Sequence, residues 1–413
     1  MPWSLPVAED IFTEEYFSDP HRVYAEMRAS GPVHRVVTPN RQQVWLVIGY
    51  AEARAALADP RLSKDVTVAQ RVYEQHTDPS VRDRDFAASL SAHMLNTDPP
   101  EHTRLRTLVG RAFTPRTVEE LRPRIREITQ DLVGRFADRL AGGATIDLVD
   151  ELAVPIPTAV ICELLGIPEP ARDTLRGAIT DLLSIGDPAV IDQASHTLAG
   201  LLMETLAAKR DDPGEDLLTG LLAAHDDGDR LTGPELVSMA MLLLVAGHET
   251  TVNLIANGVL ALLRHPGELD RLRNDRALLG GAVEELLRYD GRTNTATFRF
   301  TTEPVRLGNV EIPAEHPVVV SPLAANRDPD RFPDPDRLAV DRDSRGHLAF
   351  GHGVHHCIGA ALGRAEAHEV FAQLLERLPG FRLAVAPDEL RWRRSVLVRG
   401  LEALPVTTAP RQV

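Results

Sequence analysis

One long apolar segment in the second half of the chain most constrains the fold. It opens at Thr232-Gly233-Pro234-Glu235, where a hydroxyl and a carboxylate stand at the spacing of a capping box. No break follows before His265-Pro266-Gly267, so the segment predicts a helix of about thirty residues, near 45 Å long at ~1.5 Å per residue. Residues 236–246 are apolar on every side of that helix. Such a helix must be buried, and the chain must therefore build a large domain around it.

The apolar pattern breaks in the middle of this predicted helix, at Ala246-Gly247-His248-Glu249-Thr250-Thr251. A glycine weakens a helix by roughly 1 kcal/mol, and a buried carboxylate needs partners. Departures of this kind are expected at functional sites. Gly247 would let a ligand approach the backbone, and Thr250 can donate a hydrogen bond to a carbonyl one turn back. The alternative is a kinked core helix with a satisfied glutamate; His248 receives no role.

A glycine-rich loop, Phe350-Gly351-His352-Gly353-Val354-His355-His356-Cys357-Ile358-Gly359, precedes a second amphipathic helix. Gly351 and Gly353 permit backbone conformations that present Cys357 just where that helix begins. The helix N-terminus favours an anion, and the thiolate is the form of cysteine that binds metal. Phe350 can shield the sulfur from water. The small residues after Cys357 would let a flat group such as a haem lie close.

Three other interpretations of Cys357 compete. It could be a buried structural cysteine. It could join His352, His355 and His356 in a zinc site, although structural zinc ligands usually come as spaced pairs from two places and no partner pair is present. It could also be a catalytic thiol, which would need a base and an orienting residue that the sequence alone does not place.

The spacing Phe-Gly-x-Gly-x-His-x-Cys-x-Gly at residues 350–359 resembles the cysteine-ligand loop of the cytochrome P450 haem-thiolate monooxygenases. The resemblance extends over nearly the whole chain. It implies a mainly α fold with small β-sheets (α+β), in which a long central helix lies over haem b (iron protoporphyrin IX) and the cysteine loop. It makes Cys357 the iron ligand, places His355 against a haem propionate, and adds Phe350 and Gly351 to the cofactor site.

The break in the long helix resembles the acid-alcohol motif of the same family. By that resemblance Thr250 would hold iron-bound dioxygen and Glu249 would help to relay protons. Ala246 and Gly247 would then face the cofactor.

A basic pair follows Asp98-Pro99-Pro100. Asp98 and Glu101 predict a capped helix start with Pro99 at the first helical position. His102 and Arg106 then share one face at i,i+4. Alone, such a pair is usually a solvated helix face, but His-x-x-x-Arg after Asp-Pro-Pro resembles the propionate clamp of the family.

Two further positions concern the same pocket. Arg299 resembles another propionate contact of the family, and His93 is a weaker candidate nearby. Many relatives carry an apolar Pro-Val where this chain has Arg292-Thr293. This departure leaves the haem site intact and leaves the pocket lining, and with it the substrate, open.

Glu285 and Arg288 stand at i,i+3 on another predicted helix and can form a charge-assisted pair. An exposed pair would add little to stability. The resemblance to the Glu-x-x-Arg motif of the family implies instead a buried network that holds the fold. Its further arginine is Arg337 or Arg342, and the sequence does not decide between them.

The rest of the chain gives a coarser prediction. Residues 65–91 are polar and poorly periodic, which indicates a surface loop; in the family this region covers the pocket. Residues 118–207 are mostly helical, and in the family residues 170–209 form a lid. The other predicted elements are helices at 20–29 and 51–58, a hairpin pairing 33–37 with 44–48, and strands at 305–312 and 318–320.

Composition limits the class of protein. The 413 residues contain no linker or repeat, so we expect a single cytochrome P450 domain spanning residues 1–413, and a monomer. Two cysteines, Cys162 and Cys357, form no disulfide framework, which suits a reducing cytoplasm. The N-terminus lacks the features of a signal peptide, and the apolar run at residues 239–247 is too short to cross a bilayer, so no membrane is expected. A net charge of -15 argues against nucleic acid as a partner.

The resemblance implies insertion of one oxygen atom from dioxygen into an unactivated C–H bond, a hydroxylation or an epoxidation. The substrate class that it implies is a medium-to-large apolar molecule such as a macrolide, a polyketide or a steroid-like compound, as in antibiotic biosynthesis. The chain has neither a dinucleotide-binding fingerprint nor cysteines for an iron–sulfur cluster. Electrons must therefore come from a separate ferredoxin and an NAD(P)H-dependent ferredoxin reductase, with Arg104, Arg111 and Arg364 as candidate docking residues.

Two alternatives remain open. One keeps the haem-thiolate enzyme and changes the outcome to desaturation, coupling or peroxide-driven oxidation. Peroxide-driven relatives tend to lack the acid-alcohol pair, so Glu249-Thr250 favours dioxygen activation. The other alternative is a non-catalytic haem sensor, which needs Cys357 and has no use for a proton relay.

Overall fold

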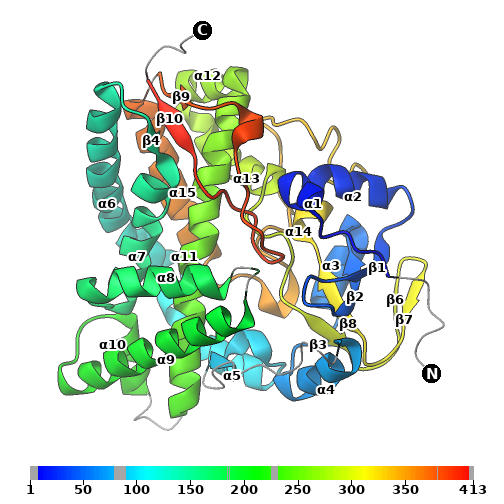
Figure 1. Cartoon of the computed structure of the whole chain (residues 1–413). Helices are drawn as coiled ribbons and strands as arrows, with labels where there is room; N and C mark the ends of the chain where they lie inside the picture. The colour runs from blue at the N-terminus through cyan, green and yellow to red at the C-terminus, as the bar shows by residue number, and fades with distance from the viewer. Residues whose placement is uncertain are drawn as a thin grey trace.

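The computed structural model describes residues 8–78, 90–183, 185, 187–224, 231–378 and 380–408. As predicted, it is mainly helical with small sheets (Figure 1). The helices are α1 Glu14–Ser18, α2 Pro20–Arg28, α3 Tyr50–Ala58, α4 Val66–His76, α5 Glu101–Gly110, α6 Pro115–Ala141, α7 Pro155–Leu165, α8 Arg172–Leu182, α9 Pro188–Asp211, α10 Leu217–Ala224, α11 Gly233–Arg264, α12 Pro266–Asn274, α13 Leu279–Tyr289, α14 Pro322–Ala325 and α15 Ala360–Arg377. The strands are β1 Val33–Val37, β2 Gln43–Val47, β3 Leu62–Ser63, β4 Ile146–Asp147, β5 Arg299–Thr301, β6 Val305–Leu307, β7 Val310–Ile312, β8 Pro317–Val320, β9 Arg382–Leu383 and β10 Pro405–Thr407.

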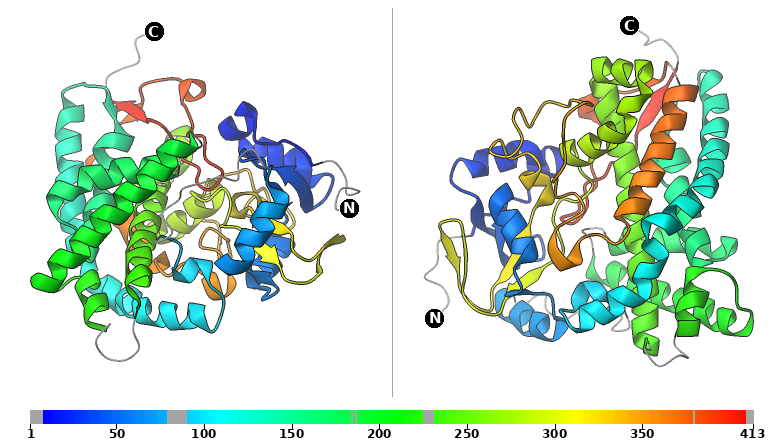
Figure 2. Two further views of the ribbon diagram at one scale, coloured as in Figure 1. Left: turned by 60° about the horizontal axis from the view of Figure 1, so that its bottom comes forward. Right: turned by 180° about the vertical axis from the view of Figure 1, so that it is seen from behind.

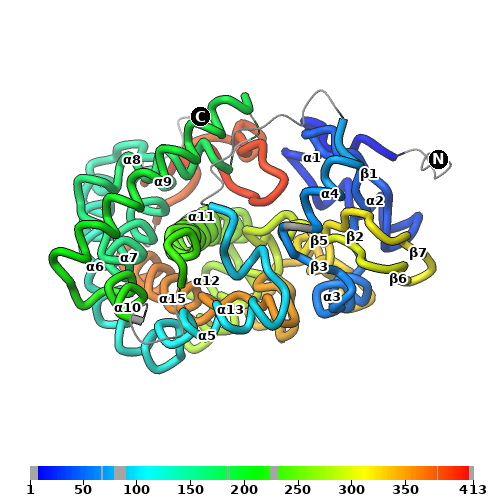
Figure 3. Tube along the Cα trace, turned by 90° about the horizontal axis from the view of Figure 1, so that it is seen from below, coloured from blue at the N-terminus to red at the C-terminus, as the bar shows by residue number. Residues whose placement is uncertain are grey.

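Helix α11 is the predicted central helix. The capping box is present: the Thr232 hydroxyl accepts a hydrogen bond from the Glu235 backbone N–H, and the Glu235 carboxylate accepts one from the Thr232 backbone N–H. Figure 1 shows α11 running through the middle of the molecule, and Figure 3 shows it end-on between the helical layers and the sheet. It is long and apolar enough to cross a membrane, but 78% of its most apolar window is buried inside the protein. It is therefore a core helix here.

The helices α7, α9, α13 and α15 pack against α11. Helix α6 packs on the outside of α15, as the rear view in Figure 2 shows. The approach of α15 is close: a Cβ added at Gly258 of α11 would lie 2.5 Å from the Phe371 ring of α15. Two hydrophobic clusters fill this helical half. The space between them, next to the middle of α11, is where the predicted site residues meet.

The smaller half contains a five-stranded sheet in the order β1-β2-β8-β5-β3. The predicted hairpin is confirmed, since β1 pairs antiparallel with β2 in the register Val33 with Val47. The prediction for residues 305–312 needs a correction, because these residues form two strands. They are the antiparallel hairpin of β6 and β7, which turns at Gly308 with φ +57°. A glycine with positive φ in the middle of the run breaks a single strand.

The prediction of a surface loop at residues 65–91 is also partly wrong. Residues 66–76 form α4, which packs against β5 and β8 and fully buries Val72. Tertiary packing against the sheet stabilises this polar helix. Residues 79–89 lie outside the described part of the chain. In the lid region, residues 170–209 contain α8 and most of α9.

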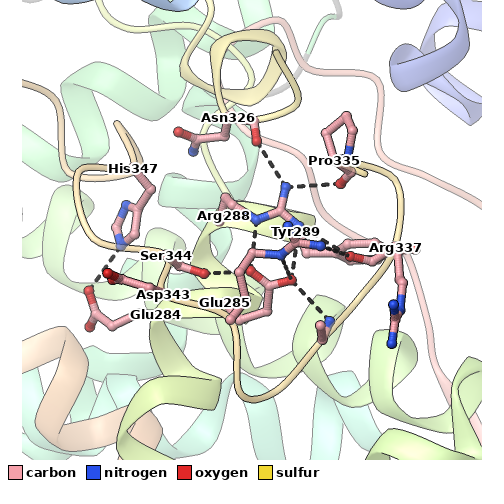
Figure 4. Close-up of polar contacts among 12 residues, drawn as sticks. Glu284, Glu285, Arg288, Tyr289, Asn326, Pro335, Arg337, Asp343, Ser344 and His347 are labelled. Carbon is pink, nitrogen blue, oxygen red and sulfur yellow. Dashed lines mark hydrogen bonds and ion pairs between the residues drawn. The ribbon is translucent and has the colours of Figure 1, made fainter. Parts of the chain in front are cut away.

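The Glu285–Arg288 pair is buried, as the resemblance implied (Figure 4). Arg288 donates from Nε and Nη2 to the two carboxylate oxygens of Glu285, at 2.7 and 2.9 Å. Arg342 is the further arginine, because its Nε donates to Glu285 Oε1 at 3.1 Å. Arg337 contributes only its carbonyl oxygen, which accepts from Arg288. The network joins α13 to the long loop that leads to Cys357.

Candidate functional site

A cavity lies between α5, α11, α15 and the cysteine loop, with about 920 Å³ of empty space including its mouth. Seven of the predicted site residues line it: His102, Arg106, Ala246, Gly247, Thr250, His355 and Cys357. Four predicted residues do not: Glu249, Arg299, Phe350 and Gly351. The remaining wall is largely apolar.

The cysteine loop adopts the backbone that its glycines predicted. Gly351 has φ +71° and Gly353 has φ +75°. At Gly353 a Cβ would also lie 2.6 Å from the Leu57 carbonyl oxygen of α3, so only glycine suits that position. The Cys357 N–H donates to the Phe350 carbonyl oxygen at 2.9 Å. Cys357 thus lies three residues before α15, partly exposed in the cavity wall and packed against the core cluster that contains Phe350.

The structure bears on two of the competing interpretations of this cysteine, the zinc site and the buried structural cysteine. Among the described residues there is no group of three or more His, Cys, Asp or Glu side chains that could hold a metal ion, which removes the ligand set of a zinc site. The second cysteine behaves as predicted for a core residue: Cys162 is buried, and burial raises the pKa of its thiol to about 11. Cys357 is the thiol that faces a cavity.

Basic side chains gather at one end of the cavity. The His102 and His355 rings lie 4.3 Å apart between centroids, and His102 Nε2 is buried without a hydrogen-bond partner among the described residues. Arg106 Nη2 donates to the His356 carbonyl oxygen at 2.7 Å. Arg299 is buried on β5, and its Nη1 donates to the Thr297 carbonyl oxygen at 3.1 Å.

Lys64 belongs to this basic cluster, and the sequence analysis missed it. The ammonium group is buried and donates to Thr297 Oγ1 at 2.5 Å and to the Phe298 carbonyl oxygen at 3.3 Å. Burial, and then the charge of Arg299, hold the pKa of Lys64 well below its ordinary value. No local pattern could have found it, because it reaches the site through pairing of β3 with β5.

The charges of this cluster indicate what it would bind. Burial and the neighbouring cations, Lys64 first and then His102, Arg299 and Arg106, lower the pKa of His355 to about 2. An anion placed among them would offset this repulsion and accept their free N–H groups. Haem carries two propionates, and so the residues present fit the acidic edge of a haem.

Asp98 does not act as the predicted helix cap. Helix α5 begins at Glu101, and Pro100 occupies the cap position without a side-chain hydrogen bond. The Asp98 carboxylate instead accepts from Ser63 Oγ at 2.5 Å and from the Lys64 backbone N–H at 3.1 Å. It therefore anchors the segment that carries Lys64 to the start of α5. The predicted i,i+4 pair still lines the cavity.

The weaker candidate His93 is buried next to this cluster and does not line the cavity. Burial, and then the charge of Lys64, lower the pKa of His93 to about 4. A neutral imidazole at this depth is better suited to packing than to holding an anion.

The middle of α11 contains the predicted alcohol facing the cavity. Thr250 Oγ1 donates to the Ala246 carbonyl oxygen at 2.6 Å, as the sequence predicted. Glu249 is buried behind it, where Oε1 accepts from Arg393 Nη1 at 2.7 Å and from Asn253 Nδ2 at 3.1 Å. Packing also explains why residue 247 is a glycine, which the sequence analysis did not foresee. A Cβ at this position would lie 2.8 Å from the Ile161 side chain of α7.

Comparison with known proteins agrees with this geometry. The family model described as Cytochrome P450 matches residues 189–395. The chain is 51% identical to Cytochrome P450 107B1 of Saccharopolyspora erythraea, over 96% of each chain. It is 50% identical to the cytochrome P450 monooxygenase PikC of Streptomyces venezuelae, over 95% of this chain and 92% of PikC. The tirandamycin C-bound structure of the P450 monooxygenase TamI superposes with a TM-score of 0.89 at 45% identity, covering 96% of this chain and 99% of TamI.

These likenesses extend over almost the full length of the relatives as well as of this chain. They include the central helix, the cysteine loop and the elements that hold the basic cluster. The chain therefore belongs to the cytochrome P450 family and is a haem-thiolate monooxygenase of the bacterial type.

Proposed function

We propose that this protein binds haem b through Cys357 and hydroxylates, or epoxidises, a large apolar small molecule of the macrolide or polyketide class. One observation supports this most directly: the thiol of Cys357 and the hydroxyl of Thr250 line the same cavity, and its lining also includes the basic residues His102, Arg106 and His355. The pieces that such an enzyme needs are thus assembled in one place by α11, the cysteine loop and α5.

The binding roles follow from charge and reach. Cys357 supplies the thiolate ligand, and the start of α15 stabilises its negative charge. His102, Arg106, Arg299 and Lys64 hold the two propionates. His355 packs against His102 at the same edge and orients it. Phe350 and Gly351 shape the loop that shields the sulfur, and Ala246 and Gly247 leave room beside α11.

When bound, the haem supplies the redox chemistry that splits dioxygen, and thiolate ligation favours that cleavage. Thr250 keeps its hydroxyl at the cavity wall through its bond to the Ala246 carbonyl, where it can donate a hydrogen bond inward. Glu249, between Arg393 and Asn253, can pass protons from the Arg393 side toward Thr250. The apolar walls of α7 and α11 exclude bulk water from the reacting atoms.

The names of relatives support the substrate class. Proteins named 6-deoxyerythronolide B hydroxylase and mycinamicin IV hydroxylase/epoxidase are 41% and 40% identical to this chain over more than nine-tenths of its length. The TamI structure already described contains tirandamycin C. A vitamin D(3) 25-hydroxylase at 46% identity supports a steroid-like substrate as the second candidate.

The electrons come, in this proposal, from a ferredoxin and an NAD(P)H-dependent reductase that serve a cytoplasmic, monomeric enzyme. Of the candidate docking residues, Arg104 forms ion pairs with Glu101 and Glu235, and Arg364 forms one with Glu284. Arg111 forms no ion pair with any described residue. Charge reversal at Arg111 should slow electron delivery and weaken its salt dependence.

The test uses the haem-loaded protein. Reduction under carbon monoxide should give the red-shifted absorption of thiolate-ligated iron, and Cys357→Ser should lose it. Turnover with surrogate redox partners, NAD(P)H and a panel of macrolides, linear polyketides and sterols should then give a product that carries one added oxygen atom. The protein could instead give a normal carbon monoxide spectrum and bind compounds that displace the iron-bound water, yet turn none of them over. That result would favour the non-catalytic haem sensor.

A further inference from the structure

Arg292 occupies the position where the sequence departs from the apolar Pro-Val of many relatives. Its side chain is 4% exposed and lines the cavity. Its Nε and Nη1 are buried and have no hydrogen-bond partner among the residues that the structure describes. A buried guanidinium without an acceptor is costly, so its surroundings must offset its charge in the working protein.

The guanidinium lies against Phe350, the first residue of the cysteine loop. The Arg292 guanidinium carbon is 4.5 Å from the centroid of the Phe350 ring, within the range of a cation–π contact. Arg364 approaches the same ring at 4.3 Å. Phe350 in turn is tied to the ligand, because its carbonyl oxygen accepts a hydrogen bond from the Cys357 N–H.

The two arginines differ in how their charges are balanced. Arg364 donates to both carboxylate oxygens of Glu284, at 2.6 and 2.9 Å, and its side chain is 39% exposed to solvent. Arg292 has no ion pair with a described residue and is buried. The nearby carboxyl of Glu366 is also buried, and burial raises its pKa to about 8, so much of it is neutral at pH 7.

Cys357 lines the same cavity as Arg292, and its sulfur would become an anion on binding iron. Burial lowers the pKa of Arg292, whereas the charge of Cys357 acts to raise it. By Coulomb's law, a positive charge on Arg292 would favour negative charge on an iron-bound sulfur in the same cavity. Buried charges and hydrogen bonds around a haem ligand are among the ways in which a protein sets its reduction potential.

We propose that Arg292 is an electrostatic tuning residue that raises the reduction potential of the haem-thiolate centre. The inference rests on the proposed haem-binding function. A positive charge beside the thiolate favours the ferrous state, which forms when the ferric centre accepts one electron from a ferredoxin-type donor. Arg292 would thereby let a weaker donor deliver the first electron than the same protein would need with a neutral residue at this position.

The experiment is a spectroelectrochemical titration of the haem-loaded protein with redox mediators. At an effective dielectric constant of about 20, a unit charge within about 10 Å is worth roughly a tenfold change in such an equilibrium. For a one-electron couple, a tenfold change is about 59 mV. Arg292→Leu should therefore shift the midpoint by about this amount to more negative values, and Arg292→Lys, which keeps the charge, should shift it by less than half as much.

Arg364→Gln is the matched control, because it removes a guanidinium from the same ring. Since Glu284 and solvent already offset that charge, its shift should be smaller than that of Arg292→Leu. An unchanged midpoint in Arg292→Leu, or equal shifts in the leucine and lysine variants, overturns the inference. If Arg292→Leu fails to retain haem, Arg292→Gln serves as the neutral variant in the same comparison.

A second measurement reports on the sulfur directly. The C–O stretching frequency of the ferrous carbon monoxide complex falls as the ligand donates more electron density, so neutral variants at Arg292 should lower it. A parent protein without the thiolate absorption would refute the proposed function. A parent with that absorption and variants with unmoved potential and stretching frequency would refute only the role of Arg292.

Discussion

The buried carboxylate of Glu285 should carry a large part of the stability of the segment that leads to the cysteine loop. We consider Glu285→Gln, which keeps the shape of the side chain and removes its charge. The carboxylate accepts from two nitrogens of Arg288, from Arg342 Nε, from Ser344 Oγ at 2.5 Å and from the Ala339 N–H at 3.1 Å. An amide offers one acceptor oxygen where two were used, and its NH₂ group faces donors.

The size of the destabilisation in Glu285→Gln follows from the buried groups that lose a partner. Arg288 and Glu285 have fully buried side chains, so the substitution leaves a guanidinium without its counter-charge. Breaking a buried pair in this way costs about 3–5 kcal/mol. Arg288 keeps three carbonyl acceptors, of Asn326, Pro335 and Arg337, so the low end of that range, about 3 kcal/mol, is expected.

Urea unfolding is the appropriate assay. At ~2.1 cal/mol/K per residue, the unfolding entropy of 413 residues makes 3 kcal/mol worth only roughly 3–4 °C in Tm, whereas urea resolves it directly. Glu119→Gln is the matched control, since Glu119 forms an i,i+3 pair with Arg122 on the exposed face of α6. That variant should unfold at the urea concentration of the parent.

The same assay separates the two arginines. Arg342→Gln should destabilise the protein, because Arg342 bonds the buried carboxylate, whereas Arg337→Gln should not, because only its backbone takes part. If the free energy of unfolding of Glu285→Gln lies within about 1 kcal/mol of that of Glu119→Gln, a factor of roughly five in the folded-to-unfolded ratio, the network does not hold the fold and the reasoning fails.

Three other outcomes are expected. Thr250→Ala should consume NAD(P)H while product per electron pair falls at least about tenfold and peroxide rises, because a proton donor at the cavity wall is lost; coupled turnover in the variant would contradict the role. Lys64→Met should lose haem to excess apomyoglobin at least about tenfold faster, since a charge-assisted hydrogen bond is worth about 1.5–3 kcal/mol; an equal transfer rate would remove Lys64 from the clamp. Although burial alone would raise it, hydrogen bonds from His347 and Arg364 lower the pKa of Glu284 from 4.5 to about 2. A carboxyl group whose pKa is depressed in the folded state stabilises the fold at pH values above its pKa in the unfolded state. The loss of unfolding free energy in Glu284→Gln, measured in urea relative to the parent, should therefore be full at pH 7 and shrink below about pH 4.5. A loss that grows on acidification would contradict the stabilising role of the Glu284 carboxylate.

Local rules explain what the sequence could predict. The capping box at Thr232, the positive-φ glycines at 351 and 353 and the i,i+4 placement of His102 and Arg106 each depend on residues within about one or two helical turns. These features can therefore be predicted from the local sequence alone. The prediction that the chain forms one domain stays a prediction.

Contacts between distant segments explain what the sequence missed. Lys64 joins the basic cluster because β3 pairs with β5, more than 230 residues away in the chain. Glu249 finds its partner in Arg393, 144 residues later. Gly247 is explained by Ile161 on a neighbouring helix. No periodicity or spacing encodes these pairings, since each depends on how whole elements pack.

The distribution of charge in the cavity also restricts how a substrate can lie. His102 and Arg106 of α5 line the cavity beside His355, and the charges of Lys64 and Arg299 also act on His355, so we expect the acidic edge of the cofactor to point there. The wall near Thr250 is formed instead by Ile161, Leu242 and Leu243, which offer no hydrogen bonds. A polar group of the substrate placed against that wall would lose its water without gaining a partner. The carbon that is oxidised should therefore belong to an apolar stretch of the substrate, with its polar groups held toward the cavity mouth.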